Sequence, residues 1–220
     1  MIPRVLEPEV MDTEKDAVEY DSMDFTEVNL AFAERAVELA AANGHQNILD
    51  IGTGTARIPI VMEQIATKAV RILGIDLSSE MLKVAEKNVS DAGLGDRITL
   101  RVVDAKKLPF GVGEFDMVIS NSLVHHIPEP GVFFSEVARV VNPSGSIFIR
   151  DLMRPGSIEE LNTLVQQYAG EADEYQQKLF RDSLHAALTI PEVQDLVRRS
   201  GIEGARVVQS TDRHWSVEKF

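Results

Sequence analysis

The chain has 220 residues, which is the size of one generous domain rather than of two independent ones. With 44% hydrophobic and 26% charged residues, its composition is that of a globular protein with enough apolar side chains for a full core. A formal charge of −13 repels phosphate backbones and disfavours nucleic acid as a partner, so we expect a small-molecule partner. The absence of cysteine excludes disulfides, thiolate metal sites and a cysteine nucleophile, and no apolar run approaches the length of a membrane span.

The amino-terminal segment is strongly acidic. Met1–Pro8 contains no hydrophobic leader region and no cleavage site, so we expect a cytoplasmic protein. Over the first 30 residues, acidic side chains far outnumber Arg4 and Lys15. Such a segment is typical of a solvated cap, and a lid that attracts a cationic ligand is the alternative. The acidic positions are Glu7, Glu9, Asp12, Glu14, Asp16, Glu19, Asp21, Asp24 and Glu27.

Helical and strand-like patterns alternate from residue 26 onward. The apolar spacing over 26–43, followed by Gly44, predicts a helix with a C-terminal stop. Short apolar runs rich in β-branched residues then alternate with helical patterns, which favours a parallel sheet covered by helices on both faces. The predicted strands are Asn47–Ile51, Val70–Ile75, Ile98–Val103, Phe115–Ser120 and Ser146–Leu152. The predicted helices between them cover 56–66, 78–92 and 131–141, the second with Ser78 as its N-cap.

The last third of the chain predicts more helix and a hairpin. Residues 155–190 have the polar, helical composition of an insertion, and Pro191 opens a further helix that stops at Ser200-Gly201. Two strand-like runs, Arg206–Ser210 and Trp215–Val217, predict a hairpin. We therefore predict a single α/β domain with a seven-stranded, mostly parallel sheet and a C-terminal antiparallel hairpin strand. Its parts are an N-terminal helical cap (1–44), a cofactor-binding core (45–152), a helical substrate insertion (153–190) and the last helix with the hairpin (191–220).

A glycine turn follows the first predicted strand. Asp50 and Ile51 lead into Gly52-Thr53-Gly54, where the missing side chains let a ligand approach the backbone closely. A dinucleotide fingerprint would place a third glycine at position 57, where this chain has Arg57. The turn therefore indicates a ligand site at the carboxyl end of this strand, without the pyrophosphate site of a dinucleotide fold.

Two carboxylates follow the next two strands. Asp76 ends the second strand beside the glycine turn, where an acid suits a bidentate hydrogen bond to two ribose hydroxyls; the alternative is a helix cap. Asp104 leaves the third strand, and a carboxylate beside an exposed backbone N–H there would recognise the amino and ring-nitrogen edge of adenine. Alone, Asp104 would be a turn residue.

Five runs of sequence occur in a fixed order along the chain. They are Leu-Asp-Ile-Gly-Thr-Gly-Thr-Ala, Gly-Ile-Asp-Leu-Ser, Asp-Ala-Lys-Lys-Leu-Pro-Phe, Phe-Asp-Met-Val-Ile-Ser-Asn and Ala-Arg-Val-Val-Asn-Pro-Ser-Gly-Ser. Together they resemble the class I S-adenosylmethionine-dependent methyltransferases, in the small-molecule branch that includes the ubiquinone and menaquinone C-methyltransferases. The resemblance covers about residues 46–152 and implies a Rossmann-like fold. The last run departs from the family's usual Leu-Lys-Pro-Gly-Gly turn but keeps Pro143 and Gly145.

The resemblance implies S-adenosylmethionine as cofactor, S-adenosylhomocysteine as product, and a role for each matching residue. Asp50, Gly52, Thr53 and Gly54 would hold the methionine part, Asp76 the ribose, Leu77 and Met81 the faces of adenine, Asp104 and Ala105 its edge, and Asn121 would lie near the ammonium group. Tyr20 matches a tyrosine that closes over the donor in relatives, although a structural role is equally open.

Two histidines follow the fourth predicted strand directly. His125 and His126 therefore lie at the edge where ligands bind in open α/β sheets, and a neutral imidazole there can take a proton from an acceptor. The alternative is that one ring packs and the other caps the loop. We predict a catalytic role for at least one of them, with His125 preferred, and we predict no metal ligands.

Cationic side chains also reach the same edge. Arginines after the fifth strand and in the hairpin turn would bind a carboxylate or phosphate of the substrate, or pair with neighbouring protein acids and leave the pocket neutral. A lid in the insertion would add one more. The candidate substrate residues are Arg150, Asp151, Arg154, Arg181, Arg213, His214 and Trp215.

These patterns favour methyl transfer to a small molecule by in-line displacement at the carboxyl edge of the sheet. A non-catalytic S-adenosylmethionine-binding protein is the main alternative, since fold alone does not establish activity. A nicotinamide-dependent oxidoreductase is a weaker alternative because of Arg57 and the hairpin. A nucleic-acid methylase is weaker still, since the chain lacks the Asn/Asp-Pro-Pro-aromatic run of those enzymes. The acceptor and the oligomeric state stay open.

Overall fold

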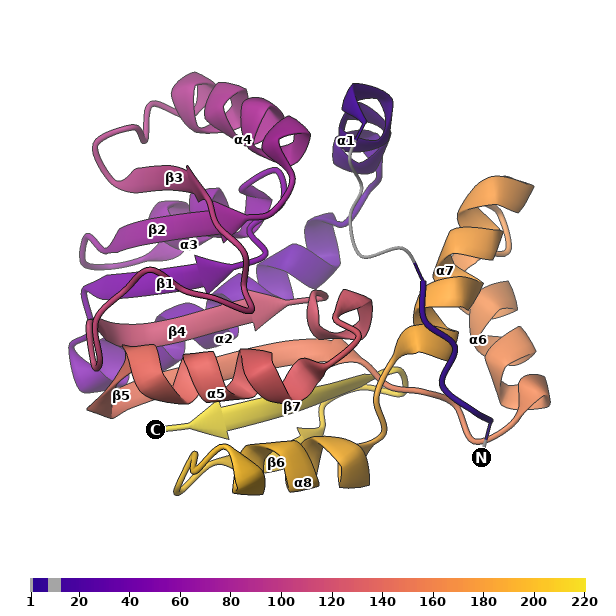
Figure 1. The fold of residues 1–220 in the computed structure, drawn as a ribbon. Helices are drawn as coiled ribbons and strands as arrows, with labels where there is room; N and C mark the ends of the chain where they lie inside the picture. The colour runs from indigo at the N-terminus through magenta and orange to yellow at the C-terminus, as the bar shows by residue number, and fades with distance from the viewer. Residues whose placement is uncertain (1, 8–12) are drawn as a thin grey trace.

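The computed structural model describes residues 2–7 and 13–220, and its strands form one seven-stranded sheet in the order β3-β2-β1-β4-β5-β7-β6 (Figure 1). The strands are β1 (Asn47–Ile51), β2 (Arg71–Asp76), β3 (Ile98–Val102), β4 (Phe115–Asn121), β5 (Val141–Leu152), β6 (Arg206–Gln209) and β7 (His214–Lys219). The α-helices are α1 (Glu14–Ser22), α2 (Thr26–Asn43), α3 (Arg57–Ile65), α4 (Ser79–Asp91), α5 (Pro130–Val140), α6 (Ile158–Ala169), α7 (Glu174–Ala186) and α8 (Ile190–Arg199). A short 3₁₀ helix, η1 (Val124–His126), follows β4.

The sheet has the predicted topology. Strands β1 to β5 are parallel, β7 pairs antiparallel with β5, and β6 pairs antiparallel with β7. The register places His214 opposite Leu152, so the hairpin turn lies at the carboxyl edge together with the ends of β1, β2 and β4. The prediction of a mostly parallel sheet with a C-terminal hairpin is confirmed.

Helix ends follow the capping signals in the sequence. Gly44 closes α2 in the left-handed conformation, with φ of 71°, and Ser78 accepts a hydrogen bond from the amide of Met81 at the start of α4. Thr189 and Glu192 form a capping box before α8. The predicted helix boundaries therefore agree with the structure to within one or two residues.

One strand differs in its bounds from the sequence prediction, and the acidic amino-terminal segment contains a helix. Strand β5 begins at Val141 rather than Ser146, because Val141 pairs with Phe115 before a register shift. Within the acidic amino-terminal segment, α1 forms with Thr13 as its N-cap, and its acidic first turn suits the positive end of the helix dipole. Glu9 and Asp12 of that segment lie outside the described residues.

The core lies in two layers, one on each face of the sheet. Helices α2, α3 and α4 cover one face, where Phe32 stacks on Phe148 with ring centroids 4.5 Å apart. Helices α5 and α8 cover the other, and Trp215 is fully buried there. Burial on both faces explains why the strands have continuous apolar runs rather than alternating ones.

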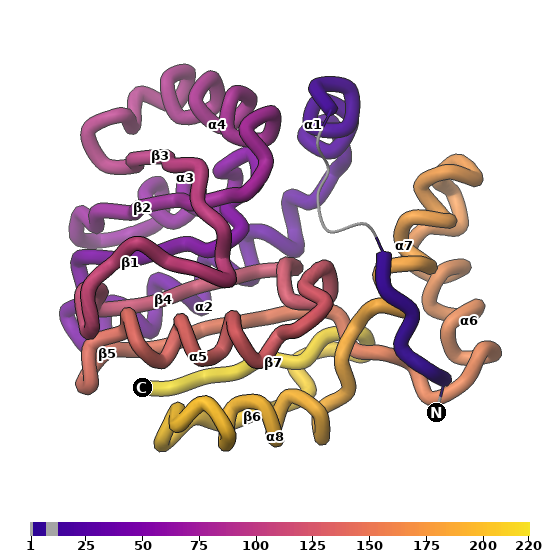
Figure 2. The backbone as a smooth tube through the Cα atoms, in the orientation of Figure 1, coloured from indigo at the N-terminus to yellow at the C-terminus, as the bar shows by residue number. Residues whose placement is uncertain are grey.

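A third group of elements gathers at the carboxyl edge of the sheet. Helices α6 and α7 pack on each other and on Ile2 and Leu152 in a small separate core. Figures 1 and 2 show residues 2–7 running past α7, and the amide of Val5 donates to the carbonyl of His185 at 3.1 Å. Among the described residues, no helix is long and apolar enough to cross a membrane.

Candidate active site

The glycine turn after β1 forms a tight backbone cradle. Gly52 and Gly54 adopt φ of 77° and 55°, a region that strongly favours glycine. A Cβ added at Gly52 would lie 2.9 Å from the side chain of Leu123, so this backbone is pressed against the loop after β4. Thr53, between the two glycines, is buried. The glycine turn is therefore packed closely against the loop after β4.

Asp76 connects this turn to the start of α4. One of its carboxylate oxygens accepts from the amide of Gly54 and the other from the amide of Ser78, each at 2.9 Å. Burial raises the pKa of Asp76, although these backbone hydrogen bonds oppose the shift. The carboxylate is thus held rigidly, and its remaining lone pairs can accept from a pair of ribose hydroxyls.

Tyr20 lies over the cradle from α1. Its ring comes within 3.9 Å of the position that a Cβ on Gly54 would take. Burial raises the pKa of Tyr20 to about 12, helped by the carboxylates of Asp76 and Asp21. Arg57 holds this helix in place, because its guanidinium donates to both oxygens of Asp21 at 2.8 and 2.6 Å. Arg57, which argued against a dinucleotide site, therefore positions the tyrosine.

The end of β4 presents an unsatisfied acceptor. The Oδ1 atom of Asn121 is buried and has no hydrogen-bond partner among the described residues. A buried polar atom without a partner is costly, which indicates that a donor group of a ligand belongs there. The ammonium group of a bound amino acid would satisfy it. The residues around the cradle thus fit S-adenosylmethionine.

The predicted adenine-binding residues lie beside α4 and after β3. Met81 is buried in the first turn of α4, whereas Leu77 is 40% exposed and available to a ligand. Asp104 accepts from the amide of Lys106 at 2.8 Å, and Ala105 packs against the core. Burial opposes the shift, but the hydrogen bonds and charge of Lys106 lower the pKa of Asp104. Asp104 is therefore an ionised acceptor at this edge.

The two histidines lie side by side in η1, with ring centroids 4.1 Å apart. His125 is buried, and its Nδ1 lies 2.5 Å from Oδ1 of Asp151, a residue that is also fully buried. Burial lowers the pKa of His125, but the carboxylates of Asp151 and Glu7 outweigh it and the pKa is raised. His125 therefore faces a carboxylate on each side of its ring.

Glu7 is a residue that the sequence interpretation missed. Its Oε1 lies 3.2 Å from Nδ1 of His126 and 3.5 Å from Nε2 of His125. Arg4 secures the same segment by donating to the carbonyls of His125, Ile127, Pro128 and Ala186. No local sequence pattern indicates that residues 4 and 7 lie beside residues 125 and 126. The signal that the sequence offered for this segment was its excess of acidic residues.

The predicted substrate arginines have different partners. Buried Arg154 binds Glu192 at 2.6 Å, and the guanidinium of Arg213 lies 3.4 Å from the ring centroid of Tyr168 and 3.7 Å from Asp212. Arg181, on α7, donates to Asn162. Arg150 stacks over Phe148 and Phe32 and has no carboxylate partner among the described residues. Because Glu192 neutralises Arg154 inside the protein, the structure does not present that residue to a ligand.

The remaining predicted substrate residues are largely enclosed. Trp215 is fully buried in the core on the α5 and α8 face, and Asp151 is engaged by His125 and by backbone amides, so neither lines an open surface. His214 is buried beside the hairpin turn, and its Nδ1 lies 2.8 Å from Oγ1 of Thr211. Burial lowers the pKa of His214 to about 4, helped by Arg213 and Arg150. The imidazole of His214 is therefore neutral near pH 7.

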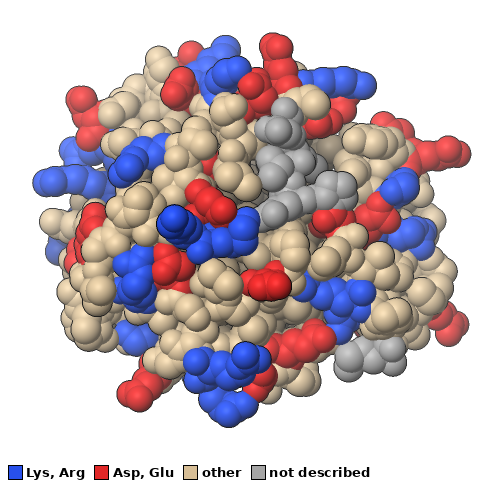
Figure 3. Space-filling view, viewed as in Figure 1, with Lys and Arg blue, Asp and Glu red and all other residues tan. Residues whose placement is uncertain are grey.

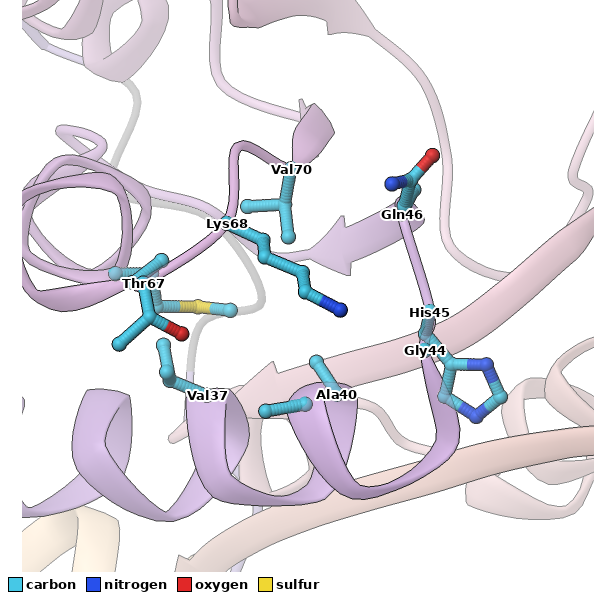
Figure 4. Close-up of a pocket in the computed structure, with 11 residues that line it drawn as sticks. Val37, Ala40, Gly44, His45, Gln46, Thr67, Lys68 and Val70 are labelled. Atoms are coloured by element: carbon cyan, nitrogen blue, oxygen red, sulfur yellow. The ribbon is translucent and has the colours of Figure 1, made fainter.

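A hollow on the opposite edge lacks this chemistry. It lies between α2 and the segment that joins α3 to β2, near Val37, Thr67 and Lys68 (Figure 4). His45 borders it, but the ring is bonded to Ser146. Charges over the face shown in Figure 3 are interspersed, with Lys and Arg beside Asp and Glu. The carboxyl edge therefore remains the site where the functional groups converge.

The fold and the arrangement of the site are similar to those of class I S-adenosylmethionine-dependent methyltransferases, and comparison with known proteins agrees. Residues 49–149 match a family model described as a methyltransferase domain. The chain is 29% identical over 184 residues to demethylmenaquinone methyltransferase of Desulfitobacterium hafniense, covering 79% of this chain and 72% of that protein. It is also 29% identical over 120 residues to the ubiquinone/menaquinone biosynthesis C-methyltransferase UbiE of a Geobacter species, covering 54% of this chain. The chain is thus similar to quinone C-methyltransferases.

The similarity covers only part of some of these relatives, and the structural similarity is one of fold. The chain spans about half the length, 51%, of the Geobacter protein. Phosphoethanolamine N-methyltransferase 2 of Haemonchus contortus, solved with S-adenosyl-L-methionine, superposes with a TM-score of 0.69 at 22% identity. That match covers 90% of this chain and 44% of that protein, and it establishes a shared fold. The cofactor of this class is S-adenosylmethionine, and its product is S-adenosylhomocysteine.

Proposed function

We propose that the protein transfers a methyl group from S-adenosylmethionine to a small-molecule acceptor at the carboxyl edge of the sheet. The observation that carries this proposal is the carboxylate of Asp76, held by the amides of Gly54 and Ser78 beside the glycine cradle. Similarity to curated methyltransferases of small molecules supports it. A cytoplasmic location stays a prediction from the sequence.

Each residue around the cradle has a binding or shielding role in this proposal. The sulfonium donor supplies an electrophilic methyl group, and the chain has to hold donor and acceptor in line and exclude water. Asp76 binds the ribose, Asn121 accepts from the ammonium group, and Tyr20 covers the donor. Asp50 is buried below the cradle, and burial raises its pKa to about 7, so a cationic ligand above it would favour the ionised carboxylate.

A general-base role for His125 or His126 stays a prediction. Both rings face Glu7, so an acceptor hydroxyl would have to take the position of the Glu7 carboxylate before either ring could accept its proton. His126 is the more accessible of the two, because its side chain is 21% exposed against 4% for His125. We propose that His126 is the ring nearer to the acceptor and that Asp151 positions His125.

We further propose that the acceptor carries an anionic group. Arg150 supports this, because it pairs in register with Asn121 and its guanidinium lies 3.4 Å from Oγ of Ser216 without a carboxylate partner among the described residues. Burial lowers the pKa of Arg150, with Glu218 opposing the shift, so the cation is only partly compensated. The carboxylate of the donor is the other anion that Arg150 could bind. Arg150 therefore recognises an anion of one ligand or the other.

Binding and turnover test the proposal in two stages. Calorimetry should show that S-adenosylhomocysteine binds and NADH does not, whereas the reverse result would contradict the class of cofactor. Tritium transfer from S-adenosylmethionine should then be measured with hydroquinones, phenols and ethanolamine phosphates as acceptors. Binding of donor without transfer to any acceptor would support the non-catalytic alternative.

The variant Arg150→Ala separates the two anions. If Arg150 binds the acceptor, KM should rise for an acidic acceptor but not for its neutral ester, with S-adenosylhomocysteine affinity unchanged. If it binds the donor, S-adenosylhomocysteine affinity itself should fall. Arg198→Ala is the matched control, because Arg198 is an exposed residue of α8 that pairs with Asp195. Equal KM changes for both acceptors would leave the anionic acceptor without support.

A further inference from the structure

Three metal-ligating atoms converge above η1. Oε1 of Glu7 lies 3.2 Å from Nδ1 of His126 and 3.5 Å from Nε2 of His125, and all three atoms lie within 4.8 Å of one another. Donor atoms about 2.1 Å from a zinc ion at tetrahedral angles are separated by about 3.4 Å. The two short separations therefore match two edges of a tetrahedral metal site.

Two of these ligands are oriented by further hydrogen bonds. Asp151 lies 2.5 Å from Nδ1 of His125, and its carboxylate is fixed by the amides of Val124 at 2.5 Å and Leu152 at 2.6 Å. The hydroxyl of Ser183 donates to the second oxygen of Glu7 at 3.1 Å. A carboxylate behind a ligating imidazole is the usual second contact in metal sites, because it fixes the ring and raises its basicity.

The amino-terminal segment is anchored independently of Glu7. Arg4 donates to the carbonyls of His125 and Ile127 at 3.1 and 2.9 Å, and its Nε donates to Ala186 at 2.6 Å. Ile2 packs into the small core of α6 and α7. The contacts of Arg4 and Ile2 therefore place Glu7 beside the histidines without the help of the Glu7 side chain.

The charges favour a cation at this position. The side chains of Glu7, His125 and Asp151 are only 8%, 4% and 1% exposed, so two carboxylates are enclosed with two imidazoles. With neutral imidazoles, the charges of the two carboxylates would be offset only in part by the nearby guanidinium of Arg4, which leaves the cluster favourable to a cation.

We propose that Glu7, His125 and His126 bind one divalent first-row transition-metal ion, for which zinc is the probe. Two imidazole nitrogens and one carboxylate oxygen suit zinc, whereas magnesium and calcium prefer oxygen ligands. Three protein ligands leave a fourth position for water or an oxygen of another ligand. The metal site does not depend on the proposed donor site. With zinc bound, however, the ring nitrogens that face Glu7 would be ligands and could not act as a general base. The proposal replaces the sequence prediction of no metal ligands.

The test is zinc titration of the full chain, freed of any histidine tag and treated with a chelator. Calorimetry should show one equivalent of zinc bound, with no saturable binding of magnesium at the same concentration. Cobalt should bind with the visible absorption bands of a tetrahedral site. Glu7→Gln and His126→Ala should each weaken zinc binding by at least roughly tenfold. His45→Gln, which alters a histidine bonded to Ser146 far from the cluster, should leave binding unchanged.

Two outcomes would overturn the proposal. The first is no saturable zinc binding by the unmodified chain, which would make the cluster an ion-pair network of protonated histidines. The second is an unchanged zinc affinity in both Glu7→Gln and His126→Ala. S-adenosylhomocysteine affinity, measured for every variant without metal, shows whether the fold is intact. A chain that binds zinc but not S-adenosylhomocysteine would contradict the proposed function alone, and the converse would contradict the metal site alone.

Discussion

Asp50 and Asp151 show how differently the two halves of the proposed site are built. The donor half is the region of the glycine turn and Asp76, and the acceptor half is the region of η1, Asp151 and residues 2–7. Both are buried carboxylates near the carboxyl ends of parallel strands, 2% and 0% exposed. Burial raises the pKa of Asp50 to about 7. Burial also opposes ionisation of Asp151, but the charge and hydrogen bond of His125 prevail and lower its pKa. In the donor half, the carboxylate of Asp50 would therefore be stabilised by a bound cation. In the acceptor half, the carboxylate of Asp151 already has its partners within the protein.

The same contrast holds for how each half is assembled. The donor half comes from consecutive turns, so Gly54 and Asp76, 22 residues apart, already define it. The acceptor half joins the two ends of the chain, since Arg4 contacts Ile127 across 123 residues and Arg154 contacts Glu192. The residues proposed to bind the donor therefore leave local sequence patterns, whereas the arrangement of the acceptor half depends on tertiary packing.

The largest effect is expected for Asp151→Asn in the acceptor half. Removing one partner of a buried charged pair should lower the free energy of unfolding by about 3–5 kcal/mol. Because the folded pKa of Asp151 is lowered, its contribution is present above the unfolded pKa and is lost as pH falls through the folded pKa. Urea unfolding should therefore show a difference between variant and wild type that shrinks toward low pH.

The control for Asp151→Asn is Asp212→Asn, since Asp212 is exposed and pairs only at the surface with Tyr168 and Arg213. Its effect should stay below about 1 kcal/mol. If Asp151→Asn were no more destabilising than this control, the contrast between the two buried carboxylates would be lost.

Asp50→Asn should act in the opposite direction. The folded pKa of Asp50, about 7, is raised, so the unmodified protein loses stability as pH rises from the ordinary carboxyl range to 7. The asparagine variant lacks this loss and should gain about 2–3 kcal/mol relative to wild type between pH 5 and pH 8. Urea unfolding at the two pH values measures it. S-adenosylhomocysteine should bind the variant more weakly, and a flat stability difference across pH would contradict the raised pKa.

The contrast between the two halves also explains which features could be predicted from the sequence. The mostly parallel sheet, the glycine turn and the place of Asp76 beside it were predictable, because buried parallel strands and helix caps leave local patterns. Glu7 and Arg4 were not, since their partners are more than a hundred residues away. The arginines were predicted at the correct edge, but only tertiary structure could show that Glu192 neutralises Arg154 while Arg150 lacks a carboxylate among the described residues.

A smaller effect is expected for Asp76→Ala in the donor half. The variant removes a carboxylate that would accept from ribose hydroxyls, so S-adenosylhomocysteine binding should weaken by about 1–3 kcal/mol. Calorimetry measures the change directly. Asp91→Ala is the matched control, because Asp91 is an exposed residue of α4 paired only with Lys87. Equal affinities for the two variants would remove Asp76 from the binding site.

Arg57→Ala should have the smallest effect on stability and still reduce donor affinity. The pair between Arg57 and Asp21 is half exposed at the arginine, so its loss should cost less than about 1 kcal/mol of unfolding free energy. Asn88 also donates to Asp21, at 3.1 Å, and Thr55 is a further hydrogen-bond partner of that carboxylate. Helix α1 therefore stays tethered without Arg57, but more loosely, and Tyr20 should cover the donor for less of the time. S-adenosylhomocysteine affinity should accordingly fall about twofold to fivefold, or by roughly 0.5–1 kcal/mol. The double variant with Asn88→Ala should lose more than either single one, because two of the partners of Asp21 are removed. Lys87→Ala breaks an exposed pair on α4 that does not touch α1, and it should change neither quantity. Wild-type affinity in the double variant would contradict the inference that Arg57 and Asn88 position Tyr20 for donor binding.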